Sequence, residues 1–429
     1  MARHLKRAPG STPADRAKIE ETVRRILADI AAEGDEAVRR YARDLDRWEG
    51  DFHVGEEQIR RVQRDLPETF KEDFEFCRRQ VQEFARLQLD SMQSFEAEVG
   101  DGITLGQRLV PIERVGCYIP GGKYPLVNAT LMSVGTARVA GVSHVVGCAP
   151  PRGPEGIFPP TLYGLHAAGA DEIYCLGGVQ AMAAMALGRV GMEAVDMITG
   201  PGNAFVAEAK RQLFGRVGID LLAGPTEILI IADDTADPAL VATDLLGQAE
   251  HGPDSPAWLV TTSERLGEAT IREVEKQLET LPTREIAEKA WRDHGEVVLV
   301  ADDDEAIAVS DDYAPEHLEV MTGRNDYYLD RLRNYGSLFL GEESTVAYGD
   351  KGVGTNHTLP TGRAARYTGG LWAGKFIKTI TYQRLTPEAS RRIAPILGRQ
   401  CEVEGMLAHK LTADVRFARY APKNVPEAG

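Results

Sequence analysis

Between residues 114 and 214 the sequence alternates short apolar runs with alanine-rich stretches of helical composition. The apolar runs are Val115–Ile119, Val142–Cys148, Glu172–Leu176 and Val195–Thr199. The stretches between and after them are Asn128–Ala140, Pro160–Ala168, Gln180–Gly188 and Phe205–Phe214. Parallel strands need long crossover connections, usually helical, so this alternation is typical of a parallel sheet covered by helices. The feature predicts an α/β fold.

A second set of the same kind follows without a Gly/Ser-rich linker. It comprises Thr226–Ala232, a helix at Pro238–Glu250, Ala257–Thr262, two charged helices that end near Trp291, and Val297–Ala301. The chain is therefore expected to contain two α/β units in series. Residues 15–95 read as a helical layer, residues 351–384 as a turn-rich stretch, and residues 387–416 as a helical tail.

Charge and cysteine content restrict the class of protein. The formal net charge is -16, which makes the chain a poor candidate for binding nucleic acid or an anionic membrane through its overall field. Apolar runs such as Ile228–Ala232 are far shorter than a membrane span requires. The five cysteines are widely spaced and contain no CxxC pair, which favours reduced thiols and a cytoplasmic location.

Three glycine-rich turns follow predicted strands. They are Gly116–Gly122, Gly177–Gln180 and Gly200–Asn203. Ligands of open parallel sheets bind outside the carboxyl ends of the strands, where these turns are expected. Glycines let backbone amides approach a phosphate, and a following helix N-terminus favours negative charge. None of the turns matches GxGxxG, and each alone could be an ordinary tight turn.

Several side chains could carry chemistry. Gln248 and His251 lie three residues apart at the end of a predicted helix and could begin a metal site, although a capping or core histidine is the commoner meaning. Glu316 and His317 pair a carboxylate with an imidazole, which suits a general base and a water activator but also occurs by chance. Asp350, His357 and His409 are the other metal-competent side chains of interest.

The segment from Lys351 to Arg384 is basic. It contains six basic residues and no acidic one. In an acidic chain such a segment suggests an anion site or a docking surface, and a solvated loop with salt bridges elsewhere is an equally good interpretation.

Five motifs, in order and spacing, resemble the histidinol dehydrogenase family, and the resemblance extends from about Leu27 to His409. They are Val195–Asn203 (VDMITGPGN), Gly218–Asp233 (GIDLLAGPTEILIIAD), Asp244–His251 (DLLGQAEH), Ala314–Glu319 (APEHLE) and Gly354–Pro360 (GTNHTLP). The resemblance implies an NAD-linked, zinc-dependent dehydrogenase that oxidises a primary alcohol through an aldehyde to a carboxylate. It also implies an intertwined homodimer of chains with two incomplete Rossmann-like domains.

Carried over motif by motif, the resemblance assigns roles to particular residues. The base would be His317, with Glu316 as its water-activating partner. The NAD contacts would be Tyr118, Gln180 and Asn203. The zinc ligands would be Gln248, His251, Asp350 and, from the other subunit, His409. The substrate pocket would be formed by Thr226, His317, Asp350, His357, Glu404 and His409.

The resemblance also implies a division of the chain. The predicted segments are an N-terminal helical segment (1–30), a helical layer (31–113), an NAD-binding domain (114–225), a second, metal-binding and catalytic domain (226–383), and a C-terminal helical tail that reaches the partner's site (384–429).

Two departures from the histidinol enzymes bear on the substrate. Tyr124–Thr130 and Arg363–Trp372 look like the sulfopropanediol 3-dehydrogenase branch of the family, which oxidises 2,3-dihydroxypropane-1-sulfonate to sulfolactate. The basic segment agrees with an anionic substrate, since a sulfonate calls for guanidinium, ammonium or amide donors. L-histidinol is the alternative substrate, and Glu404 would suit its amine. A catalytically silent binding protein is disfavoured by the intact set of catalytic and metal-ligating side chains.

Overall fold

The computed structural model describes residues 2–9, 14–122 and 124–422, and the outermost residues of the predicted terminal segments lie outside the described part. The chain forms two compact units. The first comprises Met1–Leu89 and Ile112–Phe376, and the second comprises Asp90–Pro111 and Ile377–Gly429. Residues 90–111, grouped with the helical layer in the sequence analysis, therefore group with the C-terminal residues in the structure. The functional domain boundaries drawn from the sequence remain predictions.

The first sheet of the larger unit confirms the predicted strand–helix alternation. Its strands are β4 (Arg114–Tyr118), β5 (His144–Ala149), β6 (Glu172–Cys175), β7 (Met197–Thr199) and β8 (Gly218–Ile219). They are parallel and lie in the order β6-β5-β4-β7-β8. The strand order reverses between β4 and β7, so the carboxyl ends of these two strands flank the point where such sheets bind ligands.

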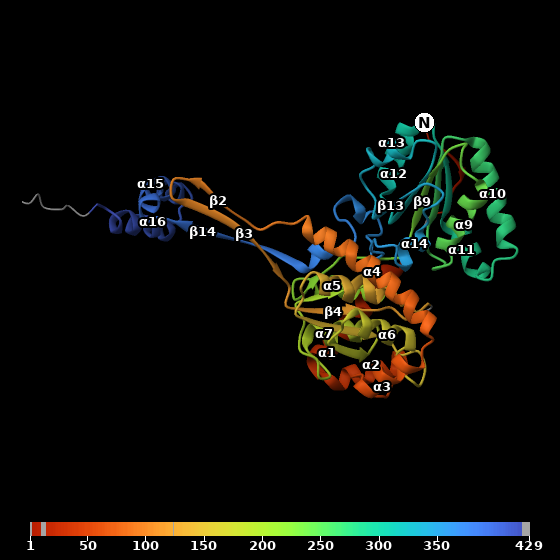
Figure 1. Cartoon of the computed structure of the whole chain (residues 1–429), viewed down its shortest axis with the longest axis horizontal. Helices are drawn as coiled ribbons and strands as arrows, with labels where there is room; N and C mark the ends of the chain where they lie inside the picture. Colours follow the sequence, from red (N-terminus) through yellow and green to blue (C-terminus); the bar gives the residue numbers. More distant parts are fainter. Residues whose placement is uncertain (1, 10–13, 123, 423–429) are drawn as a thin grey trace, which may run out of the picture. The chain divides into compact units, whose positions relative to one another are not determined.

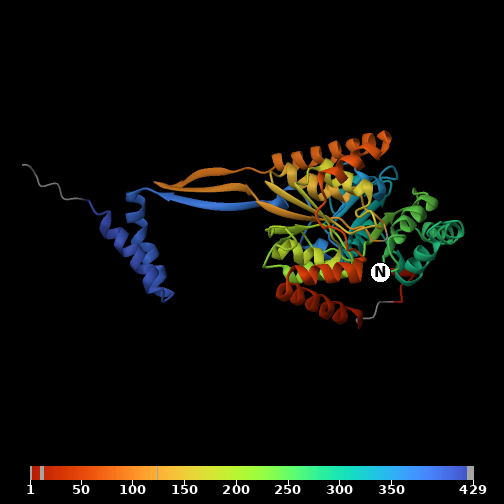
Figure 2. The ribbon, with the colours of Figure 1, turned by 90° about the horizontal axis from the view of Figure 1, so that it is seen from below.

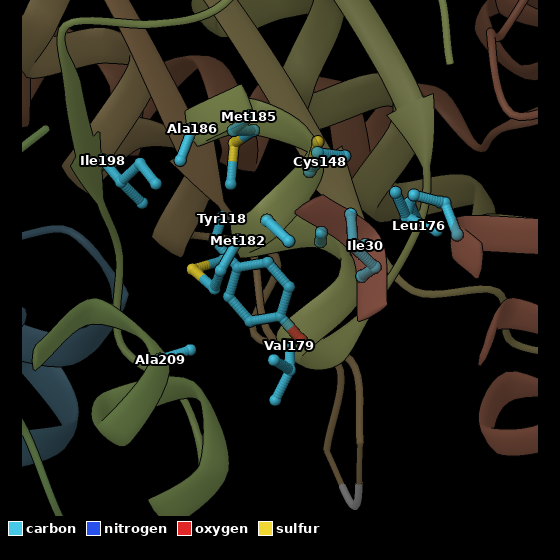
Figure 3. Close-up of a cluster of buried hydrophobic side chains, with 14 of the residues drawn as sticks. Ile30, Tyr118, Cys148, Leu176, Val179, Met182, Met185, Ala186, Ile198 and Ala209 are labelled. Carbon is cyan, nitrogen blue, oxygen red and sulfur yellow. The ribbon is translucent and has the colours of Figure 1, made fainter. Parts of the chain in front are cut away.

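Helices cover both faces of this sheet (Figure 1). After β4 come a π-helical turn η1 (Leu131–Gly135) and α5 (Thr136–Val139), followed by α6 (Pro159–Ala168), α7 (Gly178–Leu187) and α8 (Ala204–Leu213). The N-terminal layer contains α1 (Ala14–Glu33), α2 (Asp35–Asp46), α3 (Glu56–Asp65) and α4 (Glu68–Asp90). α1 packs on α7 and α8, and Ile30 joins their buried core next to Met182 and Tyr118 (Figure 3).

The second sheet repeats the same topology. Its strands are β9 (Ile228–Ala232), β10 (Ala257–Thr261), β11 (Gly295–Leu299), β12 (His317–Met321) and β13 (Ser337–Leu340), with β1 (Arg3–Lys6) antiparallel at the edge. The order is β1-β11-β10-β9-β12-β13. Its helices are α9 (Pro238–Ala249), α10 (Glu264–Leu278), α11 (Arg284–His294), α12 (Asp303–Tyr313), α13 (Asn325–Leu329) and α14 (Val346–Lys351). The sequence analysis did not predict β12 and β13.

The smaller unit joins segments that are far apart in the sequence. β2 (Phe95–Gly100), β3 (Ile103–Pro111) and β14 (Ile377–Leu385) form an antiparallel sheet in the order β14-β3-β2 (Figure 2). α15 (Pro387–Val403) and α16 (Leu407–Arg419) pack against each other as the predicted helical tail. The prediction that residues 351–384 are only turn-rich was wrong at its end, because Ile377 begins a strand that pairs with β3 along its whole length.

Neither membrane helices nor disulfides are found in the described part of the chain. Among these residues, no helix is both long and apolar enough to cross a bilayer. All five cysteines are free thiols, and Cys117, Cys148 and Cys175 are buried on the adjacent strands β4, β5 and β6. Burial raises the pKa of Cys175 to about 12. These thiols are therefore protonated core residues.

Candidate active site and nucleotide cavity

The three glycine-rich turns lie at the carboxyl ends of β4, β6 and β7, as predicted. Gly200 has a φ of +119°, and a Cβ at this position would lie 2.1 Å from the Tyr118 carbonyl oxygen. Gly178 has a φ of +58° at the start of α7. Side chains are excluded at Gly200 by the close approach of the β4 backbone, and left-handed φ angles favour glycine at both positions.

A buried ion pair fixes the turn after β7. Lys210 and Asp220 are both almost fully buried and form a short contact with each other. Lys210 Nζ donates to the Gly200 carbonyl oxygen at 2.9 Å, and Asp220 Oδ2 accepts from the Gly200 amide at 2.9 Å and from Thr199 Oγ1 at 2.8 Å. Because each charge is paired and hydrogen-bonded, the turn is held from both its amide and its carbonyl side.

A cavity of about 310 Å³ lies in front of these turns. It is lined by Asp46, Tyr118, Pro120, Gly121, Gly122, Tyr124, Leu126, Pro150, Gly178, Asn203 and His251. Two of the three predicted NAD contacts, Tyr118 and Asn203, are thus on its wall. The Tyr118 hydroxyl accepts from the Gly178 amide at 3.2 Å, and Asn203 Oδ1 caps α8 by accepting from the Phe205 and Val206 amides.

The third predicted NAD contact, Gln180, is fully buried, and its Nε2 donates to Asp46 Oδ2 at 2.8 Å. Asp46, at the end of α2, is the residue that lines the cavity. The sequence analysis missed Asp46, because nothing in the charged helical layer marks one carboxylate among many.

The predicted catalytic pair lies at the amino end of the second sheet. His317 begins β12, and in the strand register it is level with Ile228 of β9 and Ser337 of β13. Glu316 directly precedes β12, and Thr226 lies two residues before β9. Thr226 Oγ1 donates to Glu316 Oε2 at 2.5 Å. The Glu227 amide also donates to Glu316 Oε2, at 3.0 Å. Two donors thus hold the Glu316 carboxylate beside the imidazole of His317.

The two ring nitrogens of His317 lie in different surroundings. Its Nδ1 lies 3.0 Å from the Glu227 carbonyl oxygen, which can only accept, so a proton on Nδ1 satisfies this contact. Its Nε2 is buried without a hydrogen-bond partner among the described residues and lies 3.7 Å from Asp350 Oδ1. The nitrogen that could take up a proton therefore faces the cavity.

Neighbouring charges and burial shift the pKa values of this group. Burial lowers the pKa of His317, but the carboxylates of Glu316 and Asp350 outweigh it and raise the value to about 9. Burial raises the pKa of Glu316 to about 7. Burial alone would also raise the pKa of Asp350, yet the nearby imidazoles of His317 and His357 hold it well below its usual value.

Two of the three metal-ligand candidates of the larger unit line the same cavity, which has a volume of about 320 Å³. His251 and Asp350 line it together with Glu316, His317 and His357, and the charge of Asp350 acts on the pKa of His251. Gln248 Nε2 lies 3.1 Å from His317 Nδ1 and 2.5 Å from Thr226 Oγ1.

The donor set fits zinc chemically, because this ion accepts carbonyl, imidazole and carboxylate ligands. Among the described residues, no group of three or more His, Cys, Asp or Glu forms a metal site. The predicted set has only His251 and Asp350 of those types in the larger unit, since Gln248 contributes a carbonyl. His357 donates through Nδ1 to the Asp350 backbone oxygen at 2.9 Å, and its Nε2 is also buried without a partner.

The last two predicted site residues belong to the smaller unit. Glu404 caps the C-terminus of α15, and His409 lies on α16; both are exposed. His409 lines a hollow of about 680 Å³ formed by α15, α16, β3 and β14.

The basic segment does not form a single anion site. Arg363 and Arg366 both bond to Asp312 Oδ1, at 2.8 and 2.9 Å, and Lys375 Nζ bonds to Thr368. Lys378 and Arg384 lie on β14 of the smaller unit. Lys351 is different: it ends α14 beside Asp350, and its charge acts on the pKa values of Asp350, His251 and His357.

Comparison with known proteins gives consistent results. The family model described as histidinol dehydrogenase matches residues 11–417. A "Histidinol dehydrogenase homolog" of Shouchella clausii is 54% identical over 98% of this chain and 100% of its own length. A "Sulfopropanediol 3-dehydrogenase" of Ruegeria pomeroyi is 49% identical over 98% of this chain and 97% of its own. The crystal structure of histidinol dehydrogenase from Elizabethkingia anophelis matches with a TM-score of 0.89 at 35% identity, covering 97% and 95% of the two chains.

Proposed function

The chain belongs to the histidinol dehydrogenase family of NAD-dependent oxidoreductases, and from this premise we propose that it oxidises a small anionic diol, 2,3-dihydroxypropane-1-sulfonate, to the carboxylate sulfolactate. The observation that carries the reaction type is His317 Nε2, which has no hydrogen-bond partner among the described residues and belongs to a side chain that lines one cavity together with Glu316, His251 and Asp350. This cavity shares Pro120, Leu126, Asn203 and His251 with the cavity at the glycine-rich turns. A proton acceptor and a cofactor site thus adjoin.

The proposed base is His317. Its Nδ1 proton is held by the Glu227 carbonyl oxygen, which fixes the ring and leaves Nε2 to remove the proton of the substrate alcohol. The carboxylates of Glu316 and Asp350 raise the pKa of His317 to about 9, so part of their charge must be offset before the imidazole is neutral at pH 7. Ligation of a cation by Asp350 would do so.

The positions of the side chains around the two cavities indicate which residues would bind the two cofactors. Gln248, His251 and Asp350, with His409 of the partner subunit, would hold zinc, and Tyr118, Asn203 and the glycine-rich turns would hold NAD. Bound zinc would supply Lewis acidity toward the substrate oxygen, and NAD would take up the hydride. Thr226, His357 and Glu404 would complete the substrate pocket.

Glu316 is proposed to act in the second oxidation, in which the aldehyde must be hydrated before a further hydride can leave. With a pKa raised to about 7, its carboxylate can accept a proton from water near neutral pH. The hydrogen bonds from Thr226 Oγ1 and the Glu227 amide hold the carboxylate in place for this role. Acid–base work is thereby divided between two adjacent residues.

The substrate assignment rests on similarity. The relative named for sulfopropanediol is 49% identical to this chain over nearly its full length, whereas a histidinol dehydrogenase of Thermus thermophilus is 41% identical. L-histidinol remains the second candidate, because the motifs of the catalytic pair are those of the whole family and Glu404 would suit an amine.

The assay that tests the function follows NADH formation with each substrate separately. We expect 2,3-dihydroxypropane-1-sulfonate to give two NADH per molecule and a kcat/KM at least about 100-fold higher than L-histidinol, since one pocket cannot complement both an anion and a cation. Turnover of histidinol with no turnover of the sulfonate would overturn the substrate assignment. Turnover of neither would overturn the proposed function.

Lys351 is proposed to attract the sulfonate. It belongs to the basic segment, and its charge acts on Asp350 and His251, which line the cavity at His317. Lys351→Met should raise the KM for the sulfonate roughly two- to fivefold, as expected for an exposed charge. Lys375→Met, which removes the same charge from a residue bonded to Thr368, is the matched control. Equal KM values for the two variants, at unchanged zinc content, would exclude this role.

The assembly is proposed to be a homodimer in which His409 acts on the partner's site. Ile396, Leu397, Leu407, Leu411 and Val415 of the smaller unit are each 50 to 64% exposed. An apolar surface of this extent is typical of a protein interface. A second copy of the chain would cover it.

A further inference from the structure

Asp46 is the carboxylate among the described residues that line the cavity of about 310 Å³ at the glycine-rich turns, which we call the nucleotide cavity. Its Oδ2 accepts from the Gly177 amide at 3.2 Å and from Gln180 Nε2 at 2.8 Å. Among the described residues, no basic side chain pairs with Asp46, and no donor bonds to its Oδ1. Burial raises the pKa of Asp46, and the two hydrogen bonds lower it. A partly buried acceptor oxygen is therefore left for a ligand.

The position of Asp46 within the cavity indicates which part of the ligand it meets. The nucleotide cavity and the catalytic cavity, which is the one lined by Glu316 and His317, have four lining residues in common: Pro120, Leu126, Asn203 and His251. These shared residues mark the end of the nucleotide cavity that lies near the reacting groups. Asp46 lines only the nucleotide cavity, together with Gly121, Pro150 and Gly178. It therefore faces the part of a dinucleotide that lies away from the nicotinamide.

An ionised carboxylate only accepts hydrogen bonds, so the ligand group must be a donor. Next to turns whose backbone amides suit a pyrophosphate, the donors of a dinucleotide are the ribose hydroxyls. In other parallel-sheet enzymes an acidic residue at this kind of site bonds the ribose 2′-hydroxyl, and a basic residue accommodates a 2′-phosphate. A phosphate at the same place would be repelled by the carboxylate, and the described residues that line the cavity include no lysine or arginine to offset it.

We propose that Asp46 binds a ribose hydroxyl of the dinucleotide and thereby makes the site selective for a cofactor that lacks a 2′-phosphate. The inference rests on the proposed binding of NAD in this cavity. Gln180 then acts as a positioning residue: it contacts Asp46, and its own side chain is buried behind the carboxylate.

Calorimetric titration of the full-length chain with ADP-ribose and with 2′-phospho-ADP-ribose tests this directly, because the two probes differ only in the phosphate and need no turnover. We expect the chain to bind ADP-ribose roughly 100-fold more tightly than the phosphorylated probe. Asp46→Asn and Asp46→Ser should each reduce that ratio at least about tenfold. NAD and NADP, titrated in the same way, should follow the same order.

The matched control is Asp35→Asn. Asp35 lies at the other end of α2, and its Oδ1 accepts from the Val190 amide at 2.9 Å, so it braces a turn without lining the cavity. Its variant should keep the ratio of the native chain. If both Asp46 variants weaken the two probes equally, Asp46 only braces the turn and the inference is wrong. If the native chain binds both probes equally, selectivity is absent; if it binds neither probe nor NAD, the proposed function fails as well.

Discussion

Replacing His317 by asparagine is expected to lower kcat for the alcohol substrate at least about 100-fold, in the range for loss of a general base. The amide of asparagine can still donate to the Glu227 carbonyl oxygen, as the Nδ1 of His317 does, so the local backbone has no reason to move. What disappears is Nε2, the atom that faces the cavity without a partner. The measurement is the initial rate of NADH formation at saturating substrate.

Two further measurements make this result specific. Zinc content should be unchanged, because His317 is proposed as the base and the ligands are proposed to be Gln248, His251, Asp350 and His409. Loss of zinc from the variant would mean that base and ligand have been confused. His166→Asn, on the exposed side of α6, is the control substitution and should leave kcat as it is.

The parts of the fold that could be predicted are those whose signal is local. β4 to β7 and their helices were predicted because each apolar run is bounded by turn residues and followed by a helical stretch. β12 was not predicted because it begins with the charged and polar pair Glu316 and His317, whereas His317 is the first residue of a fully buried strand. β14 was missed because it pairs with β3, more than 250 residues earlier, and a pairing that remote leaves no local pattern.

The site shows the same division between local and remote information. The rule that ligands bind at the carboxyl ends of parallel strands correctly placed the glycine-rich turns of the first sheet. It does not apply to Thr226, Glu316 and His317, which lie at the amino ends of β9 and β12. The two sheets have the same strand order, yet the cavity lined by both Asn203 and His317 is formed by the carboxyl edge of the first sheet and the amino edge of the second. That combination depends on how the two sheets pack, which no single motif encodes.

Mixing two inactive variants is expected to restore activity, and this is the second large effect. The variants are His409→Ala and His317→Ala, each of which should have lost most of its activity alone. The proposed exchange of His409 between subunits means that a mixed dimer has one site with both lesions and one with neither. After subunit exchange of equal amounts, about half of the dimers are mixed, so activity should return to about a quarter of that of the native chain.

The physical reason lies in the smaller unit. Its α15–α16 pair keeps few apolar side chains buried: Ala389 and Ala394 are buried on α15, and no residue of α16 is. A pair of helices with so small a core gains its stability from another surface, and a second copy of the chain offers one. If instead each chain completed its own site, every site in the mixture would keep one lesion. No recovery at any mixing time, with exchange verified by a mass-labelled subunit, would then assign His409 to its own chain.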